Sequence, residues 1–272
     1  MNPIVFEPEK VEERWKEYGY QEVYLQYQGQ KTRYKAILKD GRLIAIVSRS
    51  YRLIPLEVSQ AVAERAAGLL QAEKVRDEKV YSEDGVPIRQ YLVYDLRRKL
   101  GEVKGVEVGM GLTVVNSVDG STAFSLLLTN VLRRGDARAF AIVPSRMMTF
   151  LSPTEVLGYQ RYVHAGKKPV DAEEVMVERI VKLATETERF MPFFQLWAET
   201  TVDEDLIQML RGRLPRIYLP PSIQEASLRT YVSVFDLYVE IAQRIWESAR
   251  IGISRKIELF RALHSIMKGP TP

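Results

Sequence analysis

The sequence predicts an α+β protein in which a curved antiparallel sheet with one inserted helix is followed by a C-terminal helical half. Three observations support this class: apolar residues alternate with period two through the first part of the chain, Asp-Gly turns separate the alternating runs, and the period then becomes helical. Because strands precede helices instead of alternating with them, the order is not that of a doubly wound sheet. We therefore expect a mostly antiparallel β domain with a basic hairpin over residues 1–150. Residues 151–272 would form a helical region that is part of the same domain or an oligomerisation module.

The strands are predicted from alternation and from the turns that bound it. Gly41 and Gly120 each follow an aspartate, which is a strong hairpin signal because glycine accepts positive φ and aspartate tolerates it. One helix interrupts the strands, beginning at Pro55, a residue suited to a first helical turn, and ending near Gly68. The predicted strands are Gln21–Gln28, Thr32–Lys39, Arg42–Ser48, Glu73–Val80, Ile88–Leu96, Glu107–Val115, Ser121–Leu132 and Ala137–Val143.

Helical periodicity dominates after Ser152. Asp171 and Glu174 have capping-box spacing and open a long predicted helix through Trp197, with a kink at Pro192. Aromatic residues at helical spacings are expected mostly in the core, with some packing subunits together in a homo-oligomer. The other predicted helices are Glu204–Arg213, Ile223–Arg250 and Ser254–Met267. The aromatic residues are Phe190, Phe193, Phe194, Trp197, Phe235, Tyr238 and Trp246.

Composition limits the classes of function. The chain has no Cys, which excludes disulfides, Cys-ligated zinc, iron–sulfur clusters and thiol nucleophiles. No apolar run approaches the roughly 18 residues of a membrane-spanning helix, and the acidic, mixed N-terminal segment is not that of a signal peptide. We therefore expect a cytoplasmic protein without a membrane partner. The absence of Cys and the presence of only three Asn are typical of a thermophile's protein.

Positive charge is concentrated in one predicted hairpin. The whole chain has a net charge of +4, but residues 31–52 carry seven basic side chains against one acid. Cations that follow a phosphate backbone, next to an aromatic ring on which a base can stack, are typical of single-strand nucleic-acid binding. The alternative is that these cations keep an exposed sheet face soluble and discourage edge pairing. The predicted nucleic-acid-binding residues are Arg33, Lys35, Lys39, Arg42, Arg49, Tyr51 and Arg52, together with Arg133, Arg134 and Arg138 of a second basic group.

The turn at Asp40-Gly41 also predicts a register for the hairpin. A two-residue turn places apolar residues opposite one another on one face, which must be buried, and cations on the other face. Directly opposed like charges destabilise the pairing by some tenths of a kcal/mol, and an anion lying across them would relieve that cost. The predicted pairs are Leu38–Leu43, Ala36–Ala45 and Tyr34–Val47 on the apolar face, and Lys39–Arg42, Ile37–Ile44 and Lys35–Ile46 on the charged face.

The segment from Asn116 to Ser121 reads Asn-Ser-Val-Asp-Gly-Ser, the composition of a turn closed by side-chain hydrogen bonds. It is either a structural turn or part of a phosphate-binding groove that Asn116, Ser117 and Ser121 shape or line. Asp119 would repel an anion and is better interpreted as a turn-former. Asn130 on the next strand places an amide on a mostly apolar face, where it needs hydrogen-bond partners.

This segment resembles the Asn-Ser-His-Asp-Gly-Ser signature of the phage/plasmid-like protein family, a domain of unknown function. Thr129 and Asn130 match the family's Cys-Thr-Asn-Gly segment, whereas Val118 stands in place of the signature His. Residues 36–51 resemble the family's hairpin ending in Val-Ser-x-x-Tyr, and the resemblance covers roughly residues 30–200 when Pro55-Leu56-Glu57 is included as a helix start. It implies an α+β domain with a curved antiparallel sheet, carried by mobile elements and similar in pattern to the strand-annealing proteins RecT and Red-beta.

Together these features predict a protein that binds single-stranded DNA, or RNA, or anneals strands, in association with a virus or mobile element and without a cofactor. No catalytic residue is predicted, because His164 and His264 are isolated and the glycines of residues 101–111 lack P-loop spacing. Two alternatives stay open: a structural or interaction protein, and a metal-dependent nuclease. The acidic residues available to a nuclease are Asp77, Glu78, Asp84 and Asp95.

Overall fold

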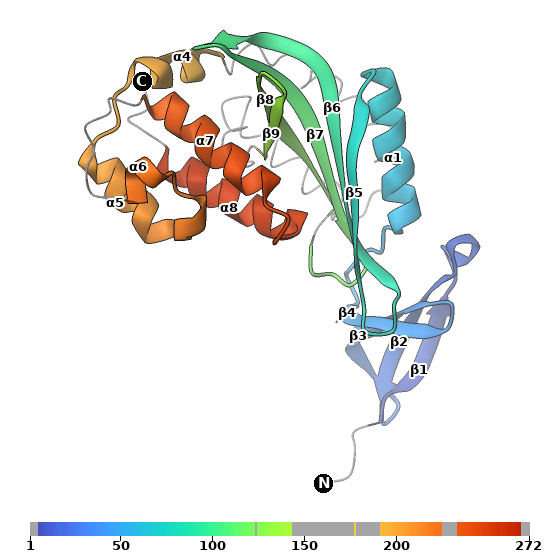
Figure 1. Cartoon of the computed structure of the whole chain (residues 1–272). Helices are drawn as coiled ribbons and strands as arrows, with labels where there is room; N and C mark the ends of the chain where they lie inside the picture. Colours follow the sequence, from blue (N-terminus) through green and yellow to red (C-terminus); the bar gives the residue numbers. More distant parts are fainter. Residues whose placement is uncertain (1–4, 123, 143–176, 178–190, 225–232, 268–272) are drawn as a thin grey trace.

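The computed structural model describes residues 5–122, 124–142, 177, 191–224 and 233–267. It confirms the α+β class, since two antiparallel sheets with a helix between them precede a helical half (Figure 1). Among the described residues, no helix combines the length and the apolar character needed to cross a bilayer. The predicted capping box at Asp171 and Glu174 and the aromatic residue Phe190 lie outside these residues.

The N-terminal sheet has four antiparallel strands in sequence order. Its first strand was not predicted from the sequence, because Glu-Pro-Glu-Lys-Val-Glu is mostly charged and does not alternate. A short 3-10 helix, η1 (Lys16–Tyr18), leads into the second strand and ends at Gly19, which has a φ of 77°. The strands are β1 (Glu7–Glu12), β2 (Tyr20–Tyr27), β3 (Gln30–Lys39) and β4 (Arg42–Ser48).

The β3–β4 hairpin has the predicted turn but only part of the predicted register. Asp40 and Gly41 both have positive φ, and the two pairs nearest the turn form as predicted. A bulge then shifts the pairing by one residue, so the remaining four predicted pairs are wrong. The observed pairs are Lys39–Arg42, Leu38–Leu43, Ile37–Ala45, Ala36–Ile46, Lys35–Val47 and Tyr34–Ser48.

The predicted burial of this hairpin is only partly correct, because Ala36 and Val47 are buried as predicted but side chains of the predicted charged face are buried as well. Ile37 and Lys35 are buried, at 0% and 2% exposure, because their face of the sheet packs toward the rest of the protein. A small core there contains Tyr20, Ile37 and Val47 together with Val118 from the second sheet. Leu43, which was predicted to be buried, instead lies on the outer face. Periodicity separates the two faces of β3, but the bulge places Ala45 and Val47 on the other face from Leu43, and alternation does not reveal which face another element covers.

The second sheet has five antiparallel strands, again in sequence order, and it is strongly curved (Figure 1). Helix α1 (Leu56–Leu69) covers part of it, with Val62, Ala63 and Ala66 packing in one cluster with Leu92 and Leu112. The strands are β5 (Glu73–Tyr81), β6 (Pro87–Val103), β7 (Val106–Ser117), β8 (Ser125–Arg134) and β9 (Ala137–Ile142). Strand β6 is longer than predicted because it continues past Leu96 through a bulge at which Arg97 has a φ of 51°.

The C-terminal helices fill the curve of this sheet, with α7 and α8 packed against β9 (Figure 1). Helix α5 matches its prediction: Asp203 caps it by accepting a hydrogen bond from the Leu206 amide, acids lie in its first turn and arginines in its last. The predicted single helix Ile223–Arg250 is wrong, because Ser233 is extended, bridges to Thr201 and caps a new helix. The helices are α4 (Met191–Glu199), α5 (Glu204–Arg213), η4 (Arg216–Tyr218), α6 (Pro221–Gln224), α7 (Val234–Glu247) and α8 (Ile253–Ile266).

The predicted aromatic core of the helical half is confirmed. Five of the aromatic residues are buried in the large core between the helices and the second sheet, and Phe193 is half-buried. Trp246 packs against Phe140 of β9 with ring centroids 4.7 Å apart, so this core joins strand to helix. The five are Phe194, Trp197, Phe235, Tyr238 and Trp246.

Candidate nucleic-acid interface

Most cations of the predicted basic hairpin are paired with carboxylates from neighbouring elements. Lys35 pairs with Glu22 of β2, and both side chains are buried. Lys39 lies 3.0 Å from a carboxylate oxygen of Glu57, at the start of α1, and its Nζ also donates to the carbonyl oxygen of Tyr18. The positive excess of residues 31–52 is thus partly offset, since residues 5–22 carry six acids against three basic residues.

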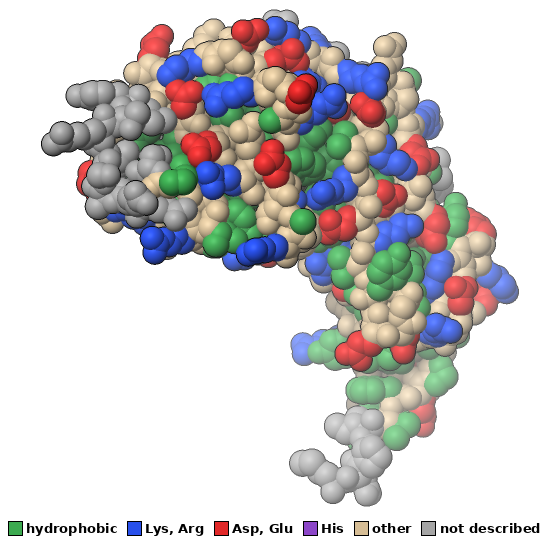
Figure 2. Space-filling view, viewed as in Figure 1, with side chains coloured by type: hydrophobic (Ala, Val, Ile, Leu, Met, Phe, Trp, Pro, Cys, Tyr) green, Lys and Arg blue, Asp and Glu red, His purple; other side chains and the backbone are tan. Residues whose placement is uncertain are grey.

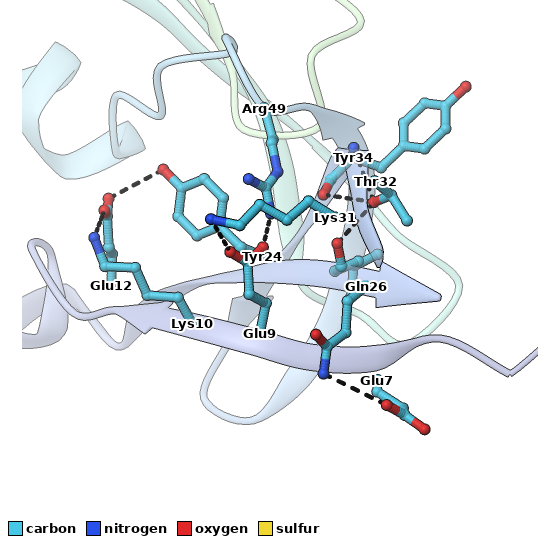
Figure 3. A network of polar contacts seen from close by, with 11 residues as sticks. Glu7, Glu9, Lys10, Glu12, Tyr24, Gln26, Lys31, Thr32, Tyr34 and Arg49 are labelled. Carbon is cyan, nitrogen blue, oxygen red and sulfur yellow. Dashed lines mark hydrogen bonds and ion pairs between the residues drawn. The ribbon is translucent and has the colours of Figure 1, made fainter. Parts of the chain in front are cut away.

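Arg49 belongs to a polar network that links β1, β2, β3 and β4 (Figure 3). The Glu9 carboxylate accepts from Arg49 and lies 2.9 Å from Lys31 Nζ. Hydrogen bonds from Lys31 and Arg49 lower the pKa of Glu9. The guanidinium of Arg49 also lies 5.1 Å from the centre of the Tyr24 ring. Both the charge and the position of Arg49 are therefore fixed within the sheet.

Three predicted cations are exposed and form no ion pair with a carboxylate of the described chain: Arg33, Arg42 and Arg52. Arg42 donates to the backbone carbonyl oxygen of Asp84 at 3.2 Å. The Nε of Arg33 donates to the Tyr34 hydroxyl at 2.9 Å, and its guanidinium lies 5.1 Å from the centre of that ring. Tyr34 itself is 37% exposed. These guanidinium groups are the ones free to meet a phosphate.

Tyr51, the ring predicted to stack a base, supports the loop between the two sheets. Its hydroxyl donates to the Ser117 carbonyl oxygen at 3.0 Å, and burial raises its pKa. The ring lies against Gly120, whose φ of 75° disfavours other residues and at which a Cβ would lie 3.2 Å from Val47 Cγ1, a tight contact. Tyr34 is the more exposed ring, and the adjacent Arg33-Tyr34 pair was the sequence signal for it.

The loop of residues 116–122 joins the second sheet to the helix and to the N-terminal sheet. Asn116 is buried, and its Nδ2 donates to the Ile54 and Pro55 carbonyl oxygens at 2.9 and 3.3 Å and to Ser59 Oγ at 3.1 Å. Ser117 Oγ closes the loop by donating to the Thr122 carbonyl oxygen at 2.7 Å and accepting from the Thr122 amide at 2.9 Å. The side chains of Asn116 and Ser117 thus form hydrogen bonds within the protein.

Ser121 and Asp119 lie on the outside of the same loop, near Arg89. Ser121 is exposed, donates to Asp119 and accepts from Arg89. Burial alone would raise the pKa of Asp119, but hydrogen bonds from the hydroxyl and the amide of Ser121 together with the charge of Arg89 lower it. Asp119 therefore stays ionised, as expected of a turn-former rather than of a residue that holds an anion.

The second basic group lies at the opposite end of β7 from the hairpin. Arg133 bridges Asp95 and Glu107 with two contacts of 2.6 Å, and Arg134 lies 3.2 Å from Asp236 of α7. Arg138 is more exposed and lies 4.0 Å from Asp95. The hairpin instead meets β7 near its Ser117 end, and ten residues of extended strand cover up to about 34 Å. The structure does not bring the two groups together into one groove.

Three of the four carboxylates available to a nuclease have other partners, and the fourth, Asp84, is exposed in the turn between β5 and β6. Asp95 is buried beside Arg133, Glu78 accepts from the Ile253 amide at the start of α8 at 2.8 Å, and Asp77 accepts from Gln90 at 3.0 Å. Across the described ranges, no three His, Asp or Glu side chains are grouped to hold a metal ion.

His264 is buried in the helical core. Its Nδ1 donates to the Phe260 carbonyl oxygen at 2.7 Å, so Nε2 accepts from the Tyr238 hydroxyl at 3.0 Å. Burial lowers the pKa of His264 to about 4. Asn130 lies against Tyr238, and its buried Nδ2 makes no hydrogen bond within the described part of the chain. The histidine therefore belongs to the core, as a neutral hydrogen-bonding group.

Comparison with known proteins adds no relative. No family model matches the chain, and neither a curated protein nor a solved structure matches it significantly. The resemblance to the phage/plasmid-like family stays a prediction from the sequence motifs.

Proposed function

We propose that this protein binds single-stranded DNA along the β3–β4 hairpin, with Arg42 beside its turn and Arg33 and Arg52 at the opposite end. The observation that carries the proposal is the set of three exposed arginines, Arg33, Arg42 and Arg52, which form no ion pair with carboxylates of the described chain. Arginine presents a planar fork of donors that matches phosphate oxygens. We further propose that the protein anneals DNA strands in the cytoplasm and that it belongs to a mobile element.

Tyr34 supplies the base-stacking surface in this proposal. Its ring is exposed and lies beside the Arg33 guanidinium. Tyr34 can therefore stack on the base of a nucleotide while Arg33 contacts its phosphate. The paired cations Lys35, Lys39 and Arg49 act indirectly by holding the strands that present these groups. A site built on few phosphate contacts is expected to bind weakly and to be sensitive to salt.

The test is a fluorescence-anisotropy titration of a labelled oligothymidylate, repeated between about 50 and about 200 mM salt. Replacing Arg33, Arg42 and Arg52 with Ala should weaken binding and flatten the log–log salt slope by about 2, since each single-strand phosphate contact contributes about 0.7. Tyr34→Ala should weaken binding about tenfold or more without changing that slope, because stacking involves no counterion.

A matched control removes the same charge elsewhere. The triple replacement of Arg65, Arg250 and Arg261, which are also exposed, lowers the net charge equally without touching the hairpin. It should leave the salt slope close to that of the wild type. Equal effects of the two triple variants, or no binding by the wild type at the lowest salt concentration, would refute the site. Parallel titrations with oligouridylate and with duplex DNA define the preferred nucleic acid.

A further inference from the structure

The outer face of the N-terminal sheet is apolar across all four strands. Val11, Val23, Ala36 and Ile46 lie directly opposite one another from β1 to β4 and form one continuous row. The neighbouring row on the same face contains Leu38 and Leu43 beside Gln21. We refer to Val11, Val23, Ala36, Leu38, Leu43 and Ile46 as the apolar face.

Three residues of the apolar face are open to solvent, whereas Val23 and Leu38 are half-buried and Ala36 is buried. Val11, Leu43 and Ile46 are 48%, 54% and 55% exposed. Hydrophobic side chains are visible on the surface of this sheet, in the lower part of the molecule (Figure 2). None of the positions in the two rows carries a charge, whereas the opposite face of the same strands holds the Lys35–Glu22 pair and Lys39. An exposed sheet face of this kind is typical of an interaction surface and unlike an ordinary solvated face.

We propose that this face binds a second copy of the same chain, giving a symmetric dimer in which two N-terminal sheets pack face to face. A surface without charge has nothing to repel its own copy and nothing to attract a nucleic acid. The face points away from the protein's own small core, which contains Ile37 and Val118 on the other side of the sheet. This inference uses none of the exposed arginines, but Tyr34 lies two residues from Ala36 on the same face of β3, so the dimer face borders the proposed base-stacking ring.

The size of the face fits a weak dimer. Two rows of side chains, about 7 Å apart along four strands that are spaced about 4.8 Å apart, present roughly 260 Å² of flat area on each copy. Two copies would bury about 500 Å² before the relief of the side chains is counted, which is below the usual range for specific interfaces and is the size of a weak contact. The helical aromatic residues, predicted from the sequence as a possible subunit interface, are mostly occupied in the protein's own core. We therefore expect a reversible dimer with a dissociation constant in the micromolar range.

Sedimentation velocity of the full-length protein from about 1 to about 100 μM, the range over which such a dimer dissociates, tests the proposal. The wild type should change from monomer to dimer over this range. Ile46→Glu should weaken dimerisation at least tenfold while circular dichroism remains that of the wild type. The matched control is Ile217→Glu, because Ile217 is equally exposed, at 57%, but lies on η4. It should dimerise normally.

Mixing charge variants distinguishes a lost contact from misfolding. A two-fold axis running across the strands places β4 over β4 of the other copy, and an axis along the strands places β4 over β1. Ile46→Glu should therefore form a heterodimer with either Ile46→Lys or Val11→Lys. A wild type that stays monomeric, a dimer that survives Ile46→Glu, or failure of both mixed pairs would overturn the proposal.

Discussion

The two sheets of this protein bury their side chains in different ways. The five-stranded sheet has α1 on it and the C-terminal helices in its curve, and its core consists almost entirely of apolar and aromatic residues. The four-stranded N-terminal sheet has a small core of six buried residues, an ion pair sealed into its inner face and an apolar outer face left partly open. The comparison indicates that the large core is self-sufficient, whereas the N-terminal sheet depends on matched charges and on its attachment to the loop around Val118.

Breaking the buried ion pair is expected to have the largest effect. Glu22→Ala leaves the Lys35 ammonium buried without a counter-charge and should lower the free energy of unfolding of the N-terminal sheet by about 3 to 5 kcal/mol. The double variant Glu22→Leu/Lys35→Met, which removes both charges, should recover much of that loss. Urea denaturation with hydrogen exchange measures the effect and locates it. Equal stability of Glu22→Ala and the double variant would show that the pair is not essential to this sheet.

The free energy of unfolding of the large core should depend on pH, because this core contains His264. The ordinary pKa of 6.5 applies to the unfolded chain, and burial lowers the folded value to about 4. Between these two values the unfolded chain binds a proton that the folded protein does not, so the free energy of unfolding falls as the pH drops from 6.5 to 4, by up to about 3 kcal/mol. Urea denaturation at pH 7 and pH 4.5 measures this loss. His264→Gln should reduce the difference, and an unchanged difference would contradict the assignment.

A smaller effect should separate the two asparagines. The two N–H groups of Asn116 Nδ2 are shared among three acceptors that connect the second sheet to the start of α1, whereas Asn130 Nδ2 has no partner within the described residues. The same truncation to Ala should therefore cost about 1 to 2 kcal/mol more at Asn116 than at Asn130. Thermal or urea unfolding of the two variants measures the difference. A greater loss at Asn130 would mean that its amide contributes more to the core than its contacts suggest.

Much of the fold follows from local patterns in the sequence. Helix α5 and strand β4 have the predicted bounds, and the Asp40-Gly41 turn forms with the predicted pairs beside it. Strand β1 and the end of β6 were missed, because both segments are rich in charged residues and lack a clear apolar alternation. Of the predicted binding residues, three arginines are exposed without a carboxylate partner, whereas Tyr51, Asn116 and Ser117 make internal contacts.

The sequence by itself determined the order and type of most elements and the position of the main hairpin turn, because these depend on residues that are near neighbours in the chain. The tertiary structure alone decided which face is covered and which charges remain free. Lys35 pairs with a glutamate 13 residues away and Arg49 pairs with one 40 residues away. A net charge counted over a short stretch of sequence does not include both members of such a pair. Electrostatic and apolar contacts act through space, so a cluster of cations along the chain becomes a charged surface only where folding leaves those cations unpaired.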